Sequence, residues 1–207
     1  FCVYPPMHSV IRVDLVLNID TGNGHDRVDI NLGEIEAGKI VRIVGNLGNG
    51  DDTFTLTGNH DVGSNASVFV DVNTGAGDDF VDASFHGYIA DRGLVDILLN
   101  GGSGDDHLNV GFFNRVDGRL NVRQFGGAGQ DEISFHSDVD NASTGLVSVL
   151  LEGGDDDDTI TYSAVGMDDP ARTNVFIDGG TGFNIGKLSR NVMCVNLNDI
   201  LWLPPLV

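Results

Sequence analysis

The sequence contains little positive charge. Only 11 of its 207 residues are lysine or arginine, against 31 aspartates and glutamates, and the formal net charge is -20. A field of this sign repels phosphate backbones, anionic lipid and polyanionic polysaccharides, so we expect no nucleic-acid partner. So large a charge also opposes compaction unless something neutralises it, which makes cations the natural ligands.

The chain also lacks long apolar runs and pairs of closely spaced cysteines. No stretch of 18 apolar residues occurs, so we expect no spanning helix and no membrane insertion. The two cysteines, Cys2 and Cys194, form no C-x-x-C motif, and whether they are bridged stays open at this point. The opening residues have no signal-peptide pattern, and we expect the chain, which begins at Phe1, to be a segment of something longer.

Glycine, by contrast, is abundant. The chain has 29 glycines and five prolines, and 41% of its residues are hydrophobic. This composition is typical of many turns that join short apolar segments, whereas disordered chains contain far fewer Val, Ile, Leu and Phe. We therefore expect a folded, turn-rich protein.

A glycine-acid cluster of nine residues recurs along almost the whole chain. Successive copies start 25–27 residues apart, a regularity that is typical of solenoids built from stacked equivalent units. The copies are TGNGHDRVD (21–29), LGNGDDTFT (47–55), TGAGDDFVD (74–82), GGSGDDHLN (101–109), GGAGQDEIS (126–134), GGDDDDTIT (153–161) and a decayed GGTGFNIGK (179–187).

Apolar residues alternate with variable ones on both sides of each cluster. For the copy at 101–109, Val95 and Ile97 precede the cluster, and Leu108 and Val110 occupy its eighth position and the position two residues further on. The same columns are apolar in nearly every copy. Alternation with a period of two predicts a strand with one buried face before and after the glycine turn. The remaining segments are predicted to be loops, with room for a third short strand.

These features predict an all-β fold, a right-handed parallel β-helix of about seven turns. We expect one domain over residues 1–207, with an N-terminal cap at 1–14, repeats at 15–187 and a C-terminal cap at 188–207. A leucine-rich horseshoe would need an L-x-x-L-x-L pattern, and helical repeats would show a spacing near 3.6. Neither pattern is present.

The clusters resemble the hemolysin-type (RTX) calcium-binding nonapeptide, G-G-x-G-x-D-x-U-x, in which U is a large apolar residue. The copy at 101–109 matches every defined position, and five of the seven copies carry the second and fourth glycines, the sixth aspartate and the eighth apolar residue. The resemblance covers residues 21–187. It implies that the sixth-position aspartate and backbone carbonyls of the glycine turn bind Ca²⁺ between neighbouring turns.

Elementary geometry leads to the same ligand. Stacked turns lie about 4.8 Å apart, so an ion midway lies about 2.4 Å from each level, which suits Ca²⁺ better than Mg²⁺. The expected carboxylate or amide ligands are Asp26, Asp52, Asp79, Asp106, Asp131, Asp158 and, more weakly, Asn184. The expected carbonyls lie around Gly22, Gly24, Gly48, Gly50, Gly75, Gly77, Gly102, Gly104, Gly127, Gly129 and Gly154. Five gaps between consecutive aspartates predict about five good sites.

The sequence departs from the family pattern in two respects. Family members carry two nonapeptides in a turn of about 18 residues, whereas this chain carries one in 25–27, which predicts a wider helix with calcium on a single edge. Asp156 replaces the fourth glycine of the sixth copy, and Asn184 and Gly186 replace the aspartate and the apolar residue of the last. The fifth-position acids are expected to face solvent; they are Asp51, Asp78, Asp105 and Asp157.

The expected function is that of a calcium-binding structural or adhesive module of a secreted or cell-surface protein, not an enzyme. Extracellular calcium would complete the fold, and a surface glycan or another protein is the expected adhesive partner. The alternatives are a polysaccharide lyase or epimerase and a glycan-binding domain. An enzyme acting on an anionic polymer would need clustered cations, and only Arg115, Arg119 and Arg123 come near one another in the sequence.

Overall fold

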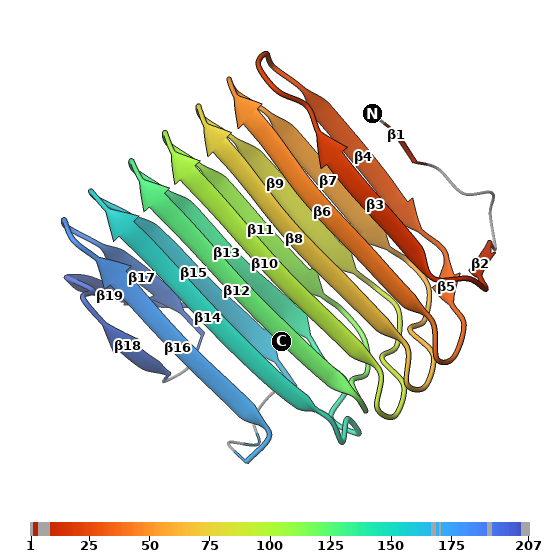
Figure 1. Ribbon diagram of the computed structural model, residues 1–207. Helices are drawn as coiled ribbons and strands as arrows, with labels where there is room; N and C mark the ends of the chain where they lie inside the picture. Colours follow the sequence, from red (N-terminus) through yellow and green to blue (C-terminus); the bar gives the residue numbers. More distant parts are fainter. Residues whose placement is uncertain (1, 4–8, 167–168, 170, 190–191, 204–207) are drawn as a thin grey trace.

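A computed structural model describes residues 2–3, 9–166, 169, 171–189 and 192–203. The chain winds through two long parallel sheets that face each other, so that each turn adds one strand to each sheet (Figure 1). The nine-stranded sheet has the order β1 (Cys2–Val3), β4 (Arg27–Leu32), β7 (Thr53–Gly58), β9 (Phe80–Phe85), β11 (His107–Phe112), β13 (Glu132–Asp138), β15 (Thr159–Val165), β17 (Ile185–Leu188) and β19 (Asp199–Trp202).

The second sheet has eight strands and stacks in the same direction. Its order is β18 (Met193–Val195), β16 (Thr173–Gly180), β14 (Leu146–Asp155), β12 (Arg119–Ala128), β10 (Leu94–Ser103), β8 (Ser67–Ala76), β6 (Ile40–Asn49) and β3 (Leu15–Asp20). Neighbouring strands in both sheets run parallel, and the described residues form no helix. The prediction of an all-β parallel solenoid of about seven turns is thus confirmed.

A third side of the solenoid is much weaker than the other two. It consists of the two-stranded sheet of β2 (Val10–Ile11) and β5 (Glu34–Ile35) and of single bridges that connect Ile35, Val62, Ile89 and Val116 in consecutive turns. The third short strand for which the sequence leaves room is therefore reduced to a single bridging residue in the three turns of Val62, Ile89 and Val116.

The apolar columns of the sequence form the core between the two sheets. Val41, Val68, Val95 and Leu120 are fully buried and stack in register, and Phe135 stacks on Tyr162 with ring centroids 5.8 Å apart. Burying one such side chain stabilises the fold by about 1.5–3 kcal/mol, so a column repeated in every turn supplies a continuous stabilising contact.

The strands of the eight-stranded sheet extend further than the sequence predicts. Strands β6, β8, β10, β12 and β14 continue through the first three residues of the glycine cluster, so that β10 ends at Ser103 and Gly102 pairs with Gly75 and Gly127. Gly102 adopts a φ of 106°, which glycine tolerates without a steric penalty. The backbone can therefore begin to turn while it still pairs with its neighbours.

The ends of the solenoid carry the two cysteines. Cys2 is exposed and lies in β1, Cys194 is partly buried and lies in β18 at the other end of the stack, and both are free thiols. Parts of both expected caps, residues 1, 4–8, 190–191 and 204–207, lie outside the described residues. No helix in the described part has the length and hydropathy required to span a membrane.

Candidate metal site at the glycine corner

The six sixth-position aspartates stand in single file at the corner where one sheet passes into the other. All but the first accept, through Oδ1, a hydrogen bond from the backbone N–H of the equivalent residue one turn earlier; Asp106 N–H donates to Asp131 over 2.9 Å. The other steps of this file are Asp26 to Asp52, Asp52 to Asp79, Asp79 to Asp106 and Asp131 to Asp158, at 2.7–2.9 Å. The predicted column is thus one continuous ladder.

Asn184 and Asn198 complete the same ladder. Asn184 accepts from the N–H of Asp158 at 2.7 Å, and its own N–H donates to Oδ1 of Asn198 at 2.8 Å. The Asn184 amide nitrogen donates to the carbonyl of Thr181 at 2.9 Å, so this side chain has a partner on both of its polar atoms.

The second carboxylate oxygen of each aspartate has no such partner. Oδ2 is buried in all six and has no hydrogen-bond partner among the described residues. The Thr74 hydroxyl lies beside the Asp79 carboxylate but donates to the carbonyl of Gly101. Asp52, Asp79, Asp106 and Asp131 are each 2% exposed. A buried acceptor without a donor is costly, and a buried negative charge without a partner is more costly still. A hydrogen-bond donor, a proton or a cation beside Oδ2 would remove this cost.

The pKa values of the buried aspartates reflect the missing partner of Oδ2. Burial raises the pKa of Asp106 and Asp158 to about 7 and the pKa of Asp131 to about 6, and neighbouring carboxylates add to the rise. The pKa of Asp79 is also raised, again mainly by burial. The backbone N–H bonds to Oδ1 act in the opposite direction but do not compensate, because they satisfy only one oxygen.

Backbone carbonyls provide further oxygens at this corner. A Cβ on Gly102 or Gly104 would overlap the carbonyl oxygen of Gly75 or Gly77 in the preceding turn, so only glycine permits this close stacking. A Cβ on the first glycine of a cluster, Gly101, would overlap both Oδ2 of Asp106 and the carbonyl oxygen of Gly126.

The sequence prediction missed this first-position carbonyl. It considered carbonyls around the second and fourth glycines, some of which already accept backbone N–H groups, as Gly22 does from Asn49 at 2.8 Å. The available signal was the change at the first position from Thr, Leu and Thr in the first three copies to Gly in the last four, because a side chain there would occupy the place where the two oxygens meet.

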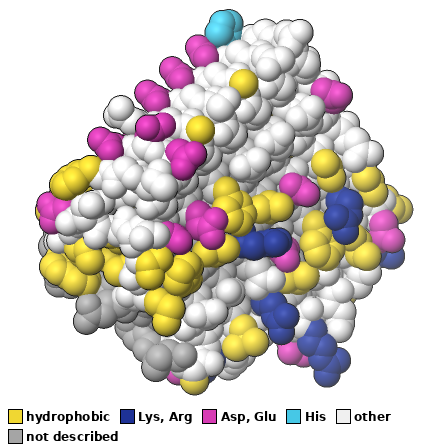
Figure 2. All heavy atoms as spheres, turned by 60° about the vertical axis from the view of Figure 1, so that its left-hand side comes forward, with side chains coloured by type: hydrophobic (Ala, Val, Ile, Leu, Met, Phe, Trp, Pro, Cys, Tyr) yellow, Lys and Arg dark blue, Asp and Glu magenta, His cyan; other side chains and the backbone are white. Residues whose placement is uncertain are grey.

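The fifth-position acids are exposed, as expected, and also have a role that the sequence did not predict. The N–H of Asp105 donates to Oδ1 of Asp78 at 2.9 Å, and the N–H of Gln130 donates to Asp105 at 2.8 Å. The carboxylates of the fifth position thus accept N–H groups of the following turn, whereas those of the sixth position accept N–H groups of the preceding turn. Figure 2 shows acidic side chains in a row along one border of the molecule.

The oxygens of the corner would suit one chemical class of metal. The described residues contain no group of three or more His, Cys, Asp or Glu side chains around a common point. A cation at the corner would therefore take one carboxylate oxygen together with backbone carbonyls, which is an all-oxygen set. Ca²⁺ accepts such ligands, whereas structural zinc sites use nitrogen and sulfur.

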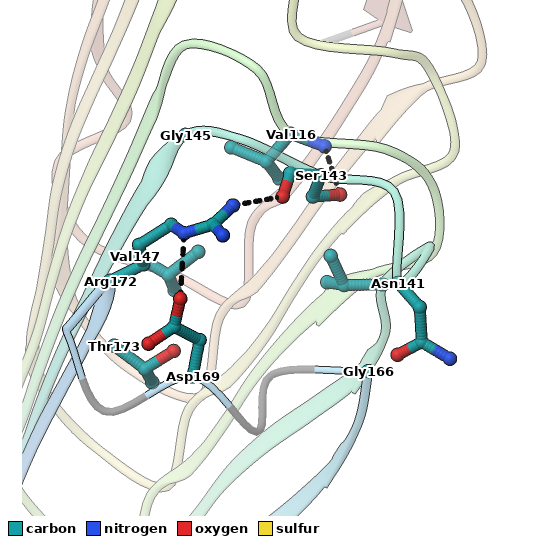
Figure 3. A pocket seen from close by; sticks show the side chains of 10 residues that line it. Val116, Asn141, Ser143, Gly145, Val147, Gly166, Asp169, Arg172 and Thr173 are labelled. Carbon is teal, nitrogen blue, oxygen red and sulfur yellow. Dashed lines mark hydrogen bonds and ion pairs between the residues drawn. The ribbon is translucent and has the colours of Figure 1, made fainter.

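A separate cavity of about 230 Å³ lies where β14 and β16 start, away from the corner at which these strands end. Arg172 reaches between Asp169 and Ser143 at its wall (Figure 3). Its Nε donates to Asp169 Oδ2 at 2.8 Å, so its charge is matched within the protein.

The arginines that an enzyme on an anionic polymer would need are largely paired in the same way. Arg115 contacts Asp117 at 2.7 Å and Arg123 contacts Asp96 at 2.8 Å. No observation on the described residues therefore favours a lyase or epimerase over a protein that binds a cation at the glycine corner.

Comparisons with known proteins do not assign a family to the chain. No protein-family model, no curated protein and no solved structure matches it. The functional argument therefore depends on the residues of the corner.

Proposed function

We propose that the chain is a calcium-binding β-solenoid that serves as a structural or adhesive module of a secreted or cell-surface protein. One observation carries the proposal: six aspartates in single file each direct a buried Oδ2 without a hydrogen-bond donor at the same corner. The similarity of the clusters to the hemolysin-type nonapeptide supports Ca²⁺ as the partner of these oxygens, and the chain would be an atypical member of that family.

The proposed ion fits the corner in charge and in spacing. Adjacent carboxylates about 4.8 Å apart repel by about 3 kcal/mol per pair at an effective dielectric constant near 20. A divalent cation between levels replaces this repulsion by attraction, and its preferred oxygen distance of about 2.3–2.6 Å is about half the step between turns. Mg²⁺ requires shorter distances and a stricter octahedral geometry, so it fits less well.

Extracellular calcium would make the module rigid after export. Binding to the folded state alone stabilises it by about 2.7 kcal/mol per site at a concentration 100 times the Kd. Extracellular modules often bind calcium with Kd values of about 10⁻⁴–10⁻³ M, so cytoplasmic calcium would leave such sites largely unloaded. A stiff rod of this kind suits a spacer or an adhesive segment, with a surface glycan or another protein as its partner.

Thermal unfolding of the full chain tests the proposal. We expect the Tm followed by circular dichroism to rise with millimolar CaCl₂, to rise less with MgCl₂ and to fall with EDTA. A variant in which the six aspartates are replaced by asparagine should lose this response. Replacing Asp51 and Asp78, the fifth-position acids of two neighbouring turns, provides the matched control and should retain it. An identical Tm in CaCl₂ and EDTA would overturn the proposal.

A further inference from the structure

The seven turns of the solenoid differ in the residue that lies at the glycine corner between the sixth-position aspartate or asparagine and the next turn. The two groups that face each other there are Oδ2 of the sixth-position residue and the carbonyl oxygen of the first-position residue one turn later. Both are acceptors and repel each other, so their close approach is favourable only with a donor or a cation between them, whereas a side chain at the first position keeps them apart. The first-position residues are, in chain order, Thr21, Leu47, Thr74, Gly101, Gly126, Gly153 and Gly179.

First-position side chains occupy this place in the N-terminal turns, although they leave Oδ2 of the aspartate without a hydrogen bond. The Thr21 hydroxyl donates to the carbonyl of Leu47 at 2.6 Å, and the Thr74 hydroxyl donates to the carbonyl of Gly101 at 2.5 Å. The Thr74 hydroxyl also lies beside the Asp79 carboxylate and acts to lower its pKa. In the turn between them, the fully buried side chain of Leu47 occupies the first position.

Three consecutive turns have no side chain at this place. A Cβ on Gly101 would overlap Oδ2 of Asp106 and the carbonyl of Gly126, so the two acceptors converge over the glycine. The same overlap recurs at Gly126 with Asp131, and at Gly153 with Asp158. All three aspartates are at least 98% buried, and their Oδ2 has no hydrogen-bond partner among the described residues. Oδ2 of Asp52 and Asp79 is equally buried and unpartnered, so the feature that sets these three turns apart is the absence of a first-position side chain.

In the last turn an N–H group lies between the sixth-position side chain and the carbonyl oxygen that faces it. A Cβ on Gly179 would meet the amide nitrogen of Asn184 and the carbonyl oxygen of Asn196, and this nitrogen donates to that carbonyl at 3.4 Å. Asparagine thus places an N–H where aspartate places a second acceptor. The preceding three turns have the same geometry with no such hydrogen.

We propose that calcium binding is confined to the three turns 101–106, 126–131 and 153–158, and that calcium controls the order of the C-terminal part of the solenoid. Each ion lies between the aspartate and the first-position carbonyl of the following turn; the pairs are Asp106 with Gly126, Asp131 with Gly153 and Asp158 with Gly179. The inference rests on the proposed function and narrows the five sites expected from the sequence to three.

The acids around these turns support this placement. The sixth copy contains four consecutive aspartates, 155–158, of which the first three are exposed. None of the four forms an ion pair with a basic group of the described residues. Asp156 and Asp157 add to the repulsion that Asp158 experiences. Negative charge is thus most concentrated at the C-terminal end of the proposed sites.

Because the proposed calcium sites lie only in the C-terminal turns, removal of calcium should destabilise some turns of the solenoid more than others. Each turn contacts only its neighbours, so the loss of ions from three turns weakens those turns and the ones beyond them. In the N-terminal turns the side chains of Thr21, Leu47 and Thr74 fill the space that an ion would need, so the proposal gives these turns no dependence on calcium. Removal of calcium should therefore open the C-terminal turns and leave a folded N-terminal part.

Calcium stoichiometry of the full chain provides the first test. Isothermal titration with CaCl₂ should give about three ions for the unaltered protein and about two for Asp106→Asn. Thr74→Gly should create the same oxygen pair one turn earlier, between Asp79 and Gly101, and give about four. Asp52→Asn, in the turn closed by Leu47, is the matched control and should leave the count at about three.

Hydrogen exchange read by mass spectrometry provides the second test. EDTA should increase exchange at least tenfold in strands β12, β14 and β16 and change it less than twofold in β6 and β8. If CaCl₂ binds with five or six ions, if Asp52→Asn removes one of them, or if exchange changes equally throughout, the confinement is wrong and the proposed function stands. Absence of any CaCl₂ binding would overturn both.

Discussion

The backbone N–H of Asp106 donates to Oδ1 of Asp131, one turn later and 2.9 Å away. This bond gives the aspartate ladder a structural role that does not need a metal. Oδ1 satisfies a buried amide of the neighbouring turn, and Oδ2 is left for a cation. Substitutions that remove one oxygen or both should therefore separate the two roles.

Asp131→Ala and Asp131→Asn should differ in stability in the absence of calcium. Alanine leaves the buried N–H of Asp106 without an acceptor, which costs about 1–3 kcal/mol. Asparagine retains this acceptor and supplies an N–H, as Asn184 does in the last turn. We expect urea unfolding in EDTA to place the asparagine variant at or above the unaltered protein, and equal losses in both variants would contradict the role assigned to Oδ1.

The metal-free protein should lose stability as the pH rises from about 5 to about 8. The folded-state pKa values of Asp106, Asp131 and Asp158 are raised to about 7, 6 and 7, above the ordinary value of a carboxyl group. The folded state thus binds more protons than the unfolded chain, and this contribution is lost as the pH passes those values. Asp29 and Asp117, whose pKa values are lowered, titrate below this range.

Urea midpoints in EDTA at both pH values measure this loss. Burial lowers the pKa of His136, and its protonation acts in the opposite direction, destabilising the fold at low pH. The triple variant Asp106→Asn, Asp131→Asn, Asp158→Asn retains His136 and isolates the carboxylates. The stability of this triple variant should fall less than that of the unaltered protein as the pH rises, or should increase with pH. Added CaCl₂ should stabilise the unaltered protein more at the higher pH, because the metal binds the ionised carboxylates.

Gly102→Ala should destabilise the fold by about 3 kcal/mol or more. Its φ of 106° is unfavourable for alanine, and the new Cβ would overlap the carbonyl oxygen of Gly75. Gly22→Ala is the control, because Gly22 has a φ of 89° and a Cβ added there would have no heavy atom within 4 Å. It should lose about 1 kcal/mol from backbone strain alone. Comparable losses in the two variants would show that close stacking is not the cause.

Asp156→Gly should stabilise the metal-free protein by about 1 kcal/mol. Asp156 adopts a φ of 80°, which a residue with a side chain adopts at a cost, and it occupies the fourth position, where the other six copies carry glycine. The substitution also removes a charge that raises the pKa of Asp158. Urea unfolding in EDTA checks the expectation, and a loss of stability would show that Asp156 makes a favourable contact.

The repeat made most of the fold predictable. Because every turn places its residues at the same heights as the turns on either side, the columns of Val95 and Leu108 specify which residues pair and which face the core. The aspartate file follows from the same periodicity, since Asp79, Asp106 and Asp131 share one offset from these columns.

The chemistry of the corner could not be predicted in this way. Which oxygen of Asp131 accepts an N–H, and that Asp105 caps Gln130 in the other direction, depend on how each peptide group is oriented in the turn. Periodicity carries no such information. Asn198 lies only 14 residues after Asn184, outside the regular spacing, and no column of the sequence identifies it as the last acceptor of the ladder.

The direction of the ladder has a consequence for how the protein emerges from a ribosome. The acceptor for each corner amide from Asp26 to Asp158 lies 25–27 residues further along the chain, so a newly made turn stays incomplete until the next one has been synthesised and packed. Each corner amide therefore gains its acceptor only after one more turn has been synthesised, whereas Asn184 gains its acceptor, Asn198, after 14 residues.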